Sequence, residues 1–215
     1  MPNNTQTKRT LKERIIDKLL LLYILGKYKF DGKIKLHKAI FFAEKTTNEK
    51  KIKVFNFNFI RYNFGEYSNE LQTDYRELVD NGFLFDTRPI EITDEGKELL
   101  SRCEGIIDRN EFILNAAEPL IEHVATLPLD KVKEMAYEKI IISGRKVADI
   151  EIGTPLLSNL DESEAKAKIL IKDDWIEKLD IIFSRGFVVV DEDTKKEYGE
   201  IYKIMKPKIR RVLVD

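Results

Sequence analysis

The sequence contains very little cysteine and histidine, and this scarcity limits the chemistry that the chain can support. Cys103 is the single cysteine among 215 residues, so the chain cannot form an internal disulfide or supply a thiolate metal site by itself. The two histidines, His37 and His123, are far apart in the sequence and have no recognisable set of metal ligands beside them. We expect structural or surface roles for both histidines and a reducing, cytoplasmic setting for the protein.

Long hydrophobic runs and the motifs of common enzymes are also missing. The apolar run at residues 15–25 is too short and too interrupted to span a bilayer, and residues 1–10 are polar and basic. We therefore expect a flexible N-terminus and no membrane association. The sequence has no glycine-rich phosphate loop, no Gly-x-Ser-x-Gly elbow and no His-Glu pair at metal-binding spacing. We expect no enzymatic activity and no cofactor or metal, and an uncatalogued enzyme is the weakest of three hypotheses.

The composition is that of a folded protein with a heavily charged surface, because 43% of the residues are apolar and 35% are charged. The charge is unevenly distributed along the chain. Residues 1–60 contain 14 Lys and Arg against 5 Asp and Glu, and the remainder contains 23 against 33. A basic end of this kind can meet nucleic acid, an acidic partner or the acidic remainder of the same chain, and the composition does not rank these.

Apolar spacing predicts two helices in the first 50 residues. The first covers residues 11–25 and the second residues 34–46, with a turn at Asp31-Gly32 between them. On a helical wheel the second helix places Leu36, Ala39, Ile40 and Ala43 on one side, and Lys35, Lys38 and Lys45 on another. We expect the lysine side to be solvated.

The next 60 residues predict a strand, a helix, a hairpin and a further helix. Residues 54–63 alternate aromatic and polar residues as a half-buried strand does, and residues 66–80 have helical spacing that ends at Asn81-Gly82. Residues 83–85 and 90–92 form a predicted hairpin, after which Thr93 caps another helix. This order is that of a winged helix-turn-helix over residues 11–105, with the hairpin as the wing.

Residues 106–215 are expected to form a mainly helical companion domain. Helical segments are predicted at residues 109–124, 129–142 and 162–183, and residues 143–158 as a loop with room for a short strand. A β-prone run follows at residues 187–190 and a last helix near residues 193–205. We expect an α+β, predominantly helical fold, in which the second domain binds a partner or forms a homodimer.

Two short motifs resemble those of a known family. The run KLHK at residues 35–38, followed by FFA at residues 41–43, is similar to the lysine-leucine-glutamine-lysine and tyrosine-phenylalanine-alanine signature of the SocA-type, or Panacea, antitoxin-like family and its phage-associated relatives. The run YNFGEYS at residues 62–68 resembles the tyrosine-glycine-proline-tyrosine-serine segment of that family. His37 stands where the family has glutamine, and Glu66 where it has proline. The resemblance implies a module that binds a protein partner such as a toxin, and also operator DNA, since antitoxins commonly repress their own operons.

A conventional winged-helix DNA-binding transcriptional regulator is the alternative. Its double-stranded DNA contacts are expected from Lys33, Lys35, Lys38, Asn69, Gln72, Thr73, Arg76 and Arg88. The predicted recognition helix, however, contains five acidic residues against the single Arg76, which gives a formal charge of −4. Such a helix is repelled by the major groove unless basic residues beside it compensate, so the sequence leaves protein and DNA open as ligands.

Overall fold

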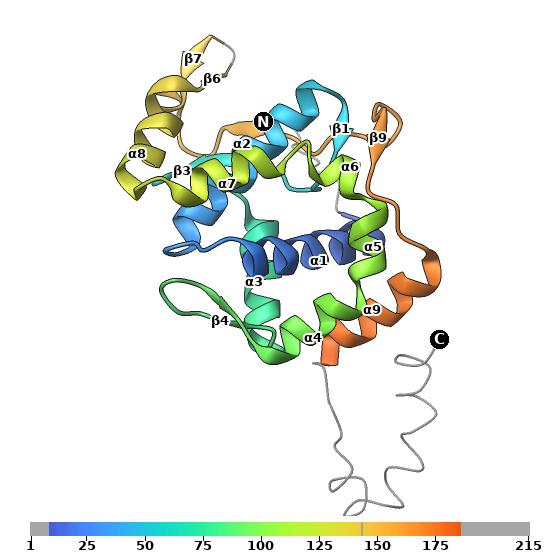
Figure 1. Ribbon diagram of the computed structural model, residues 1–215. Coiled ribbons are helices and arrows are strands. Elements are labelled where there is room, and N and C mark those ends of the chain that lie inside the picture. The colour runs from blue at the N-terminus through green and yellow to red at the C-terminus, as the bar shows by residue number, and fades with distance from the viewer. Residues whose placement is uncertain (1–8, 143, 186–215) are drawn as a thin grey trace, which may run out of the picture.

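The structure is a computed structural model that describes residues 9–142 and 144–185 (Figure 1). The predicted run at residues 187–190, the predicted helix at residues 193–205 and the first eight residues lie outside the described part of the chain. The described residues form an α+β fold in which helices predominate, which confirms that part of the expectation. None of the helices in these residues combines the length and the apolar content needed to cross a membrane.

Both predicted N-terminal helices are present. Helix α1 covers Leu11–Lys27, and helix α2 covers Lys33–Glu49. A capping box starts α1, because Thr10 accepts a hydrogen bond from the backbone of Glu13 and the Glu13 carboxylate accepts one from the backbone of Thr10. The middle of α1 is buried, as expected for a helix at the centre of the core.

The predicted strand at residues 54–63 is wrong in its first half. Strand β1 is Ile52–Lys53 and strand β2 is Phe59–Tyr62, and the extended residues between them include a run, 54–57, that is buried throughout. Alternating aromatic and polar residues do not mark a half-exposed strand here because both sides of this segment are covered. Strand β3, Gly65–Tyr67, pairs with β2, so helix α3, Asn69–Asp80, begins three residues later than predicted.

The predicted hairpin and its following helix are confirmed. Strands β4, Leu84–Phe85, and β5, Glu91–Ile92, pair antiparallel. Helix α4, Asp94–Arg102, starts at Thr93, whose hydroxyl accepts a hydrogen bond from the backbone of Gly96.

Beyond residue 102 the helices are shorter than predicted. The expected helix at residues 109–124 is divided into separate short helices. Of the expected helix at residues 162–183, only the second half is helical. The elements are α5 (Glu104–Arg109), α6 (Glu111–Leu114), α7 (Glu118–Thr126), α8 (Leu129–Glu134), the π-helical turn η1 (Met135–Lys139), β6 (Ile141–Ile142), β7 (Arg145–Lys146), the 3-10 turn η2 (Val147–Asp149), β8 (Pro155–Leu157), β9 (Ala167–Lys168) and α9 (Asp173–Arg185).

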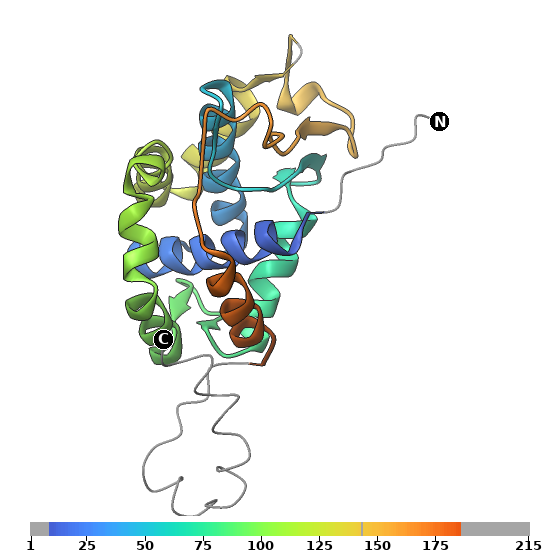
Figure 2. The same ribbon diagram turned by 90° about the vertical axis from the view of Figure 1, so that its right-hand side faces the viewer.

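The C-terminal elements wrap around the N-terminal ones. Strand β9 pairs in parallel with β1, and β8 pairs with β2, which gives the sheet order β3-β2-β8. Helix α9 packs on α1 and α3, and α7 packs on α2. In Figure 2, α1 crosses the middle of the molecule with α5–α7 on one side and β2, β3 and α3 on the other. The domain boundary after residue 105 stays a prediction. One continuous hydrophobic core contains residues from both sides of this position.

Candidate functional site

The two motifs that resemble the antitoxin-like family lie against each other in the structure. Lys38 of α2 and Glu66 of β3 form an ion pair with 2.7 Å between Nζ and Oε2, and their side chains are 1% and 0% exposed. Gly65 makes this approach possible, since its φ is +100° and a Cβ atom there would lie 2.7 Å from Lys38 Nζ. Glu66 stands where the family has proline, and it is the counter-ion of Lys38, which matches the family motif.

His37, the other departure from the pattern, holds the beginning of α3. Its Nδ1 accepts a hydrogen bond of 3.3 Å from the backbone of Ser68, the residue that caps α3. Its ring stacks on Tyr67 at 5.0 Å between centroids, and Tyr67 in turn contacts Tyr62 at 5.2 Å. Burial and the charge of Lys38 lower the pKa of His37 to about 4, so the imidazole is neutral at pH 7. We call His37, Lys38, Glu66 and Ser68 the His37 cluster.

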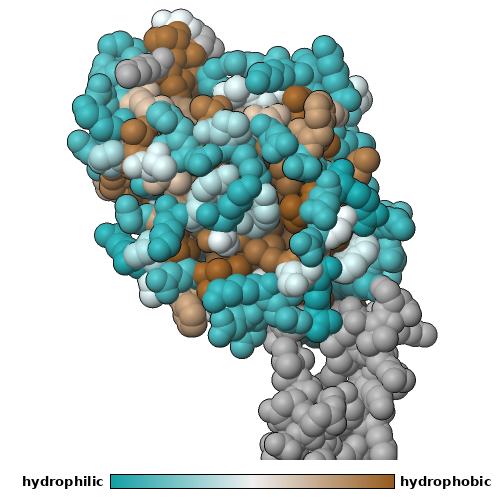
Figure 3. Space-filling model, viewed as in Figure 1, coloured by the Kyte–Doolittle hydropathy of each residue, from teal (hydrophilic) through white to brown (hydrophobic). Residues whose placement is uncertain are grey.

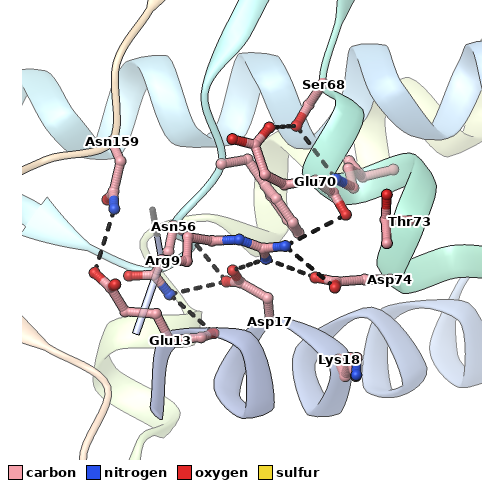
Figure 4. Close-up of polar contacts among 12 residues, drawn as sticks. Arg9, Glu13, Asp17, Lys18, Asn56, Ser68, Glu70, Thr73, Asp74 and Asn159 are labelled. Carbon is pink, nitrogen blue, oxygen red and sulfur yellow. Dashed lines mark hydrogen bonds and ion pairs between the residues drawn. The ribbon is translucent and has the colours of Figure 1, made fainter. Parts of the chain in front are cut away.

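A second buried cluster joins α1 to α3 through Arg9 (Figure 4). Arg9 Nη1 lies 2.6 Å from a carboxylate oxygen of Asp17 on α1 and 2.6 Å from one of Asp74 on α3. Asn56 donates to Asp17 Oδ1 from its backbone, at 3.0 Å, and from its side chain, at 2.9 Å. The guanidinium also lies 5.2 Å from the centre of the Phe57 ring. One arginine thus links two helices and the extended segment between β1 and β2.

Glu44 adds a carboxylate from α2 to this cluster. Its Oε1 accepts a hydrogen bond of 3.2 Å from the backbone of Phe57, and its Oε2 has no hydrogen-bond partner among the described residues. Burial raises the pKa of Glu44 well above its usual value, and the nearby Asp17 adds to the rise against the charges of Lys53 and Arg9. We call Arg9, Asp17, Glu44, Asn56 and Asp74 the Arg9 cluster.

The pKa values of the other two carboxyl groups are raised as well. Burial raises the pKa of Asp17 to about 7, against the opposing effect of Arg9 and with a further rise from Asp74. Burial also raises the pKa of Asp74, although Arg9 opposes it. The physical cause is common to all three groups, because one guanidinium cannot neutralise three buried carboxylates. The cluster therefore retains protons near neutral pH.

The structure groups several of the predicted ligand-binding residues on one side of α3. Asn69, Thr73 and Arg76 are exposed at helical spacing, and Gln72 is half-buried beside them. We call Asn69, Thr73 and Arg76 the α3 face. Arg88 is exposed in the loop between β4 and β5, on a different element.

The expectation of a solvated lysine side on α2 is wrong for Lys35 and Lys38. Both side chains are buried, because α7 and β3 cover this side of the helix. Lys35 Nζ donates a hydrogen bond of 2.7 Å to the carbonyl of Ala125 on α7, while Lys38 is paired with Glu66. Lys33 is part-exposed and pairs with Asp86 at 2.9 Å. Of the three lysines expected to contact phosphates, two point into the protein.

The acidic residues counted against the predicted recognition helix are largely compensated. Glu66 is paired with Lys38, Asp74 with Arg9, and Glu77 with Lys18 of α1. Sequence spacing could not identify these partners, since they come from other elements and Arg9 is 65 positions from Asp74. One signal was available, because Asp17 and Lys18 interrupt the apolar stripe of the first helix and a charge there needs a buried partner.

An apolar surface lies next to the beginning of α3. Tyr62 and Phe64, at the end of the β2–β3 hairpin, are 45% and 61% exposed, and Ile152 is 57% exposed. Ile152 is held beside the hairpin because Gly153 donates a hydrogen bond of 2.7 Å to the carbonyl of Arg61. We call Tyr62, Phe64 and Ile152 the hairpin tip. Tyr62 also contacts Tyr67, the last residue of β3, which immediately precedes the cap of α3.

Two further surface features are a groove and a hydrophobic area, both on the described residues. A groove of about 500 Å³ lies between the end of α2, β6 and β8, and its lining mixes Lys45, Glu49, Ile141, Leu156 and Asp161 without a convergent set of reactive groups. Figure 3 shows a largely hydrophilic face with a hydrophobic area at the β6–β7 hairpin, upper left. In the described part of the chain, no three His, Cys, Asp or Glu side chains are arranged to hold a metal ion. Cys103 is buried, and burial raises the pKa of its thiol to about 12.

Comparisons with known proteins identify no relative. A scan against protein-family models, a search of curated proteins and a search of solved structures found no match for this chain. The likeness to the antitoxin-like family therefore depends on the two motifs alone.

Proposed function

We propose that this protein is a non-enzymatic, antitoxin-like binding module on a winged-helix arrangement, and that it binds a protein partner through the hairpin tip and the α3 face. The observation that favours a protein over DNA as the ligand is that many basic side chains near the N-terminus are already paired with carboxylates of the same chain. Six cationic side chains from the first 60 residues pair with carboxylates beyond residue 60, namely Arg9, Lys18, Lys27, Lys33, Lys38 and Lys51. Much of the basic end of the sequence thus meets the acidic remainder of the same chain.

Among the predicted DNA contacts, all of which lie in the described residues, little exposed positive charge is left for a phosphate backbone. DNA-binding proteins gain most of their affinity from several exposed Lys and Arg side chains that displace counterions. Of the eight predicted DNA contacts, Lys35 and Lys38 are buried and Lys33 is paired with Asp86. Arg76 and Arg88 are the exposed cations that remain in that set. This supports a protein partner as the main ligand.

The composition of the candidate surface also suits a protein partner. Exposed aromatic residues and arginine are enriched where protein interfaces gain most of their binding energy. The hairpin tip supplies Tyr62 and Phe64, and the adjacent α3 face supplies Arg76 with two polar residues. The winged-helix arrangement itself is supported by the order α1, α2, α3, the β4–β5 hairpin and α4.

The direct test is co-expression with the product of the neighbouring gene, followed by co-purification and an affinity measurement. Phe64→Ala removes an exposed aromatic side chain at the tip and should weaken the complex about tenfold or more. Phe112→Ala is the matched control, because Phe112 is 78% exposed on α6, away from the proposed surface. Equal losses from both variants would contradict the proposed surface, and elution of the protein alone would contradict the partner.

DNA binding is the second candidate function. It is favoured by the compensation of Glu66, Asp74 and Glu77, which removes much of the repulsion expected from α3. Gel-shift measurements with random duplex DNA at about 50 and 200 mM salt test it, because binding through phosphate contacts weakens steeply with salt. Arg76→Ala should then reduce the salt slope by about one. The absence of binding at the lower salt concentration would exclude this function.

A further inference from the structure

The three helices that build the N-terminal core each place one carboxylate in the same buried region. Asp17 comes from α1, Glu44 from α2 and Asp74 from α3, and each residue is at most 1% exposed. The segment between β1 and β2 connects two of them, since consecutive residues there donate to Asp17 and to Glu44. Apolar packing brings the helices together, but buried carboxylates without a counter-ion oppose that packing.

Arg9 is the residue that neutralises this region most directly. Its guanidinium contacts both oxygens of Asp74, at 2.6 and 3.2 Å, and one oxygen of Asp17, at 2.6 Å. It also donates a long hydrogen bond of 3.5 Å to the carbonyl of Glu70 on α3. Two lysines act electrostatically on these carboxylates but have other partners, since Lys18 pairs with Glu77 and Lys53 with Glu13. A planar guanidinium with several donors suits such a site better than an ammonium group.

Arg9 reaches the cluster from outside the helices. It immediately precedes Thr10, whose capping box with Glu13 starts α1 independently of Arg9. The side chain can therefore leave the cluster without unwinding α1. Its departure would remove a direct tie between α1 and α3 and leave Asp74 without the counter-ion that it contacts.

We propose that Arg9 is a detachable latch that fixes the position of α3, so that insertion or withdrawal of the Arg9 side chain regulates the α3 face. With Arg9 in place, α3 is held at its beginning by the His37 cluster and in its middle through Asp74. With Arg9 withdrawn, the beginning stays attached and Glu77 keeps its pair with Lys18, while Asp74 loses the counter-ion that ties it to α1. The regulatory step rests on the proposed function, whereas the latch is a property of the free protein.

Hydrogen exchange of the full-length protein, measured by mass spectrometry without a partner, tests the latch. Arg9→Gln should raise the exchange of α3 backbone amides about tenfold or more and leave those of α7 unchanged, because α7 packs on α2 instead. Arg9→Lys should give an intermediate effect, since the charge remains and the paired contacts are lost. Arg14→Gln is the matched control, because this exposed arginine is on the first turns of α1.

Rescue separates a latch from a general loss of stability. Adding Asp74→Asn to Arg9→Gln removes the uncompensated charge and should return most of the protection in α3. Unchanged exchange in Arg9→Gln, an equal increase in α1, α2, α3 and α7, or the absence of rescue would each overturn the proposal. If Arg9→Gln does not fold, Arg9→Lys gives the same comparison. Partner binding is then measured separately, so that a missing partner contradicts the proposed function and not the latch.

Discussion

The two buried clusters that hold α3 differ in their charge balance. In the His37 cluster, one lysine faces one glutamate, and the imidazole is neutral at pH 7. In the Arg9 cluster, three carboxyl groups face one arginine. A balanced buried pair is costly to break but insensitive to pH near neutrality, while an unbalanced cluster exchanges protons as the pH changes. The same helix is thus fixed at one end and adjustable in its middle.

The largest effect is expected from breaking the balanced pair. Lys38→Met leaves Glu66 buried without its counter-ion and should lower the free energy of unfolding by about 3–5 kcal/mol. Urea titration followed by circular dichroism measures this change. The double variant Lys38→Met, Glu66→Leu should recover most of the loss, because replacing both charges by apolar groups is often close to neutral. A single variant with nearly wild-type stability would show that the buried pair does not hold the motifs together.

The unbalanced cluster should make stability depend on pH. The pKa of Asp17 in the folded protein is raised to about 7, so the folded state binds this proton more tightly than the unfolded chain does. The contribution is fully present below the pKa of the unfolded chain, near 4, and is lost as the pH rises to about 7. Relative to Asp17→Asn, the wild type should lose at most about 1.4 kcal/mol per pH unit in this window, as measured by urea titration.

Glu13 provides the control of opposite sign. Burial alone would raise its pKa, but the backbone of Thr10 and the charge of Lys53 lower it overall. Its contribution is therefore present above the pKa of the unfolded chain and is lost as the pH falls through the lower folded value. For Asp17, the free energies of unfolding of the wild type and of Asp17→Asn are compared from about pH 4 to 7. A constant difference between them would contradict the predicted charge imbalance in the Arg9 cluster.

The sequence predicted the elements whose signals are local. Apolar spacing located α1 and α2, and the residues Asn81-Gly82 and Thr93 located the ends around the hairpin, because these signals depend on neighbouring residues alone. The lengths of the C-terminal helices are overpredicted. Their apolar residues recur at helical spacing, but the helices end and restart where the chain changes direction to pack on the core. Helical spacing does not show where packing interrupts a helix.

The polar clusters could be predicted only in part. Both motifs of the His37 cluster were visible in the sequence, but their contact was not, because it depends on how β3 folds against α2. Whether Lys35 faces water likewise depends on α7, which begins more than 80 residues later. The sequence places Arg9 in a polar segment, and although Asp17 interrupts the apolar stripe of the first helix, nothing in the spacing indicates that Arg9 is its partner. Asp74, the other partner of Arg9, was counted as a surface charge for the same reason.

A smaller effect is expected from a methyl group placed against the balanced pair. Gly65→Ala introduces a Cβ atom 2.7 Å from Lys38 Nζ at a positive φ, whereas Gly82→Ala introduces one at a positive φ with no atom within 4 Å. Both variants should lose about 1–2 kcal/mol from backbone strain. Gly65→Ala should lose about 1–3 kcal/mol more, because the buried Lys38–Glu66 hydrogen bond must shift. Equal losses in thermal or urea unfolding would show that the pair tolerates displacement.

The smallest effect is expected from the exposed ion pair on the same helix as Lys38. Lys33 and Asp86 have side chains that are 41% and 49% exposed, so water screens their attraction. Lys33→Ala should lower the free energy of unfolding by about 0–1 kcal/mol, and high salt should reduce even that difference.

The same substitution distinguishes the two proposed ligands. A lysine that contributes little to folding can leave Asp86 and meet an incoming phosphate, so DNA binding should weaken in Lys33→Ala and its salt slope should fall by about one. Binding of a protein partner at the hairpin tip should change little, because Lys33 pairs with the β4–β5 loop instead. A large loss of stability in Lys33→Ala would place this pair with the buried clusters and remove the contrast between it and the buried Lys38–Glu66 pair.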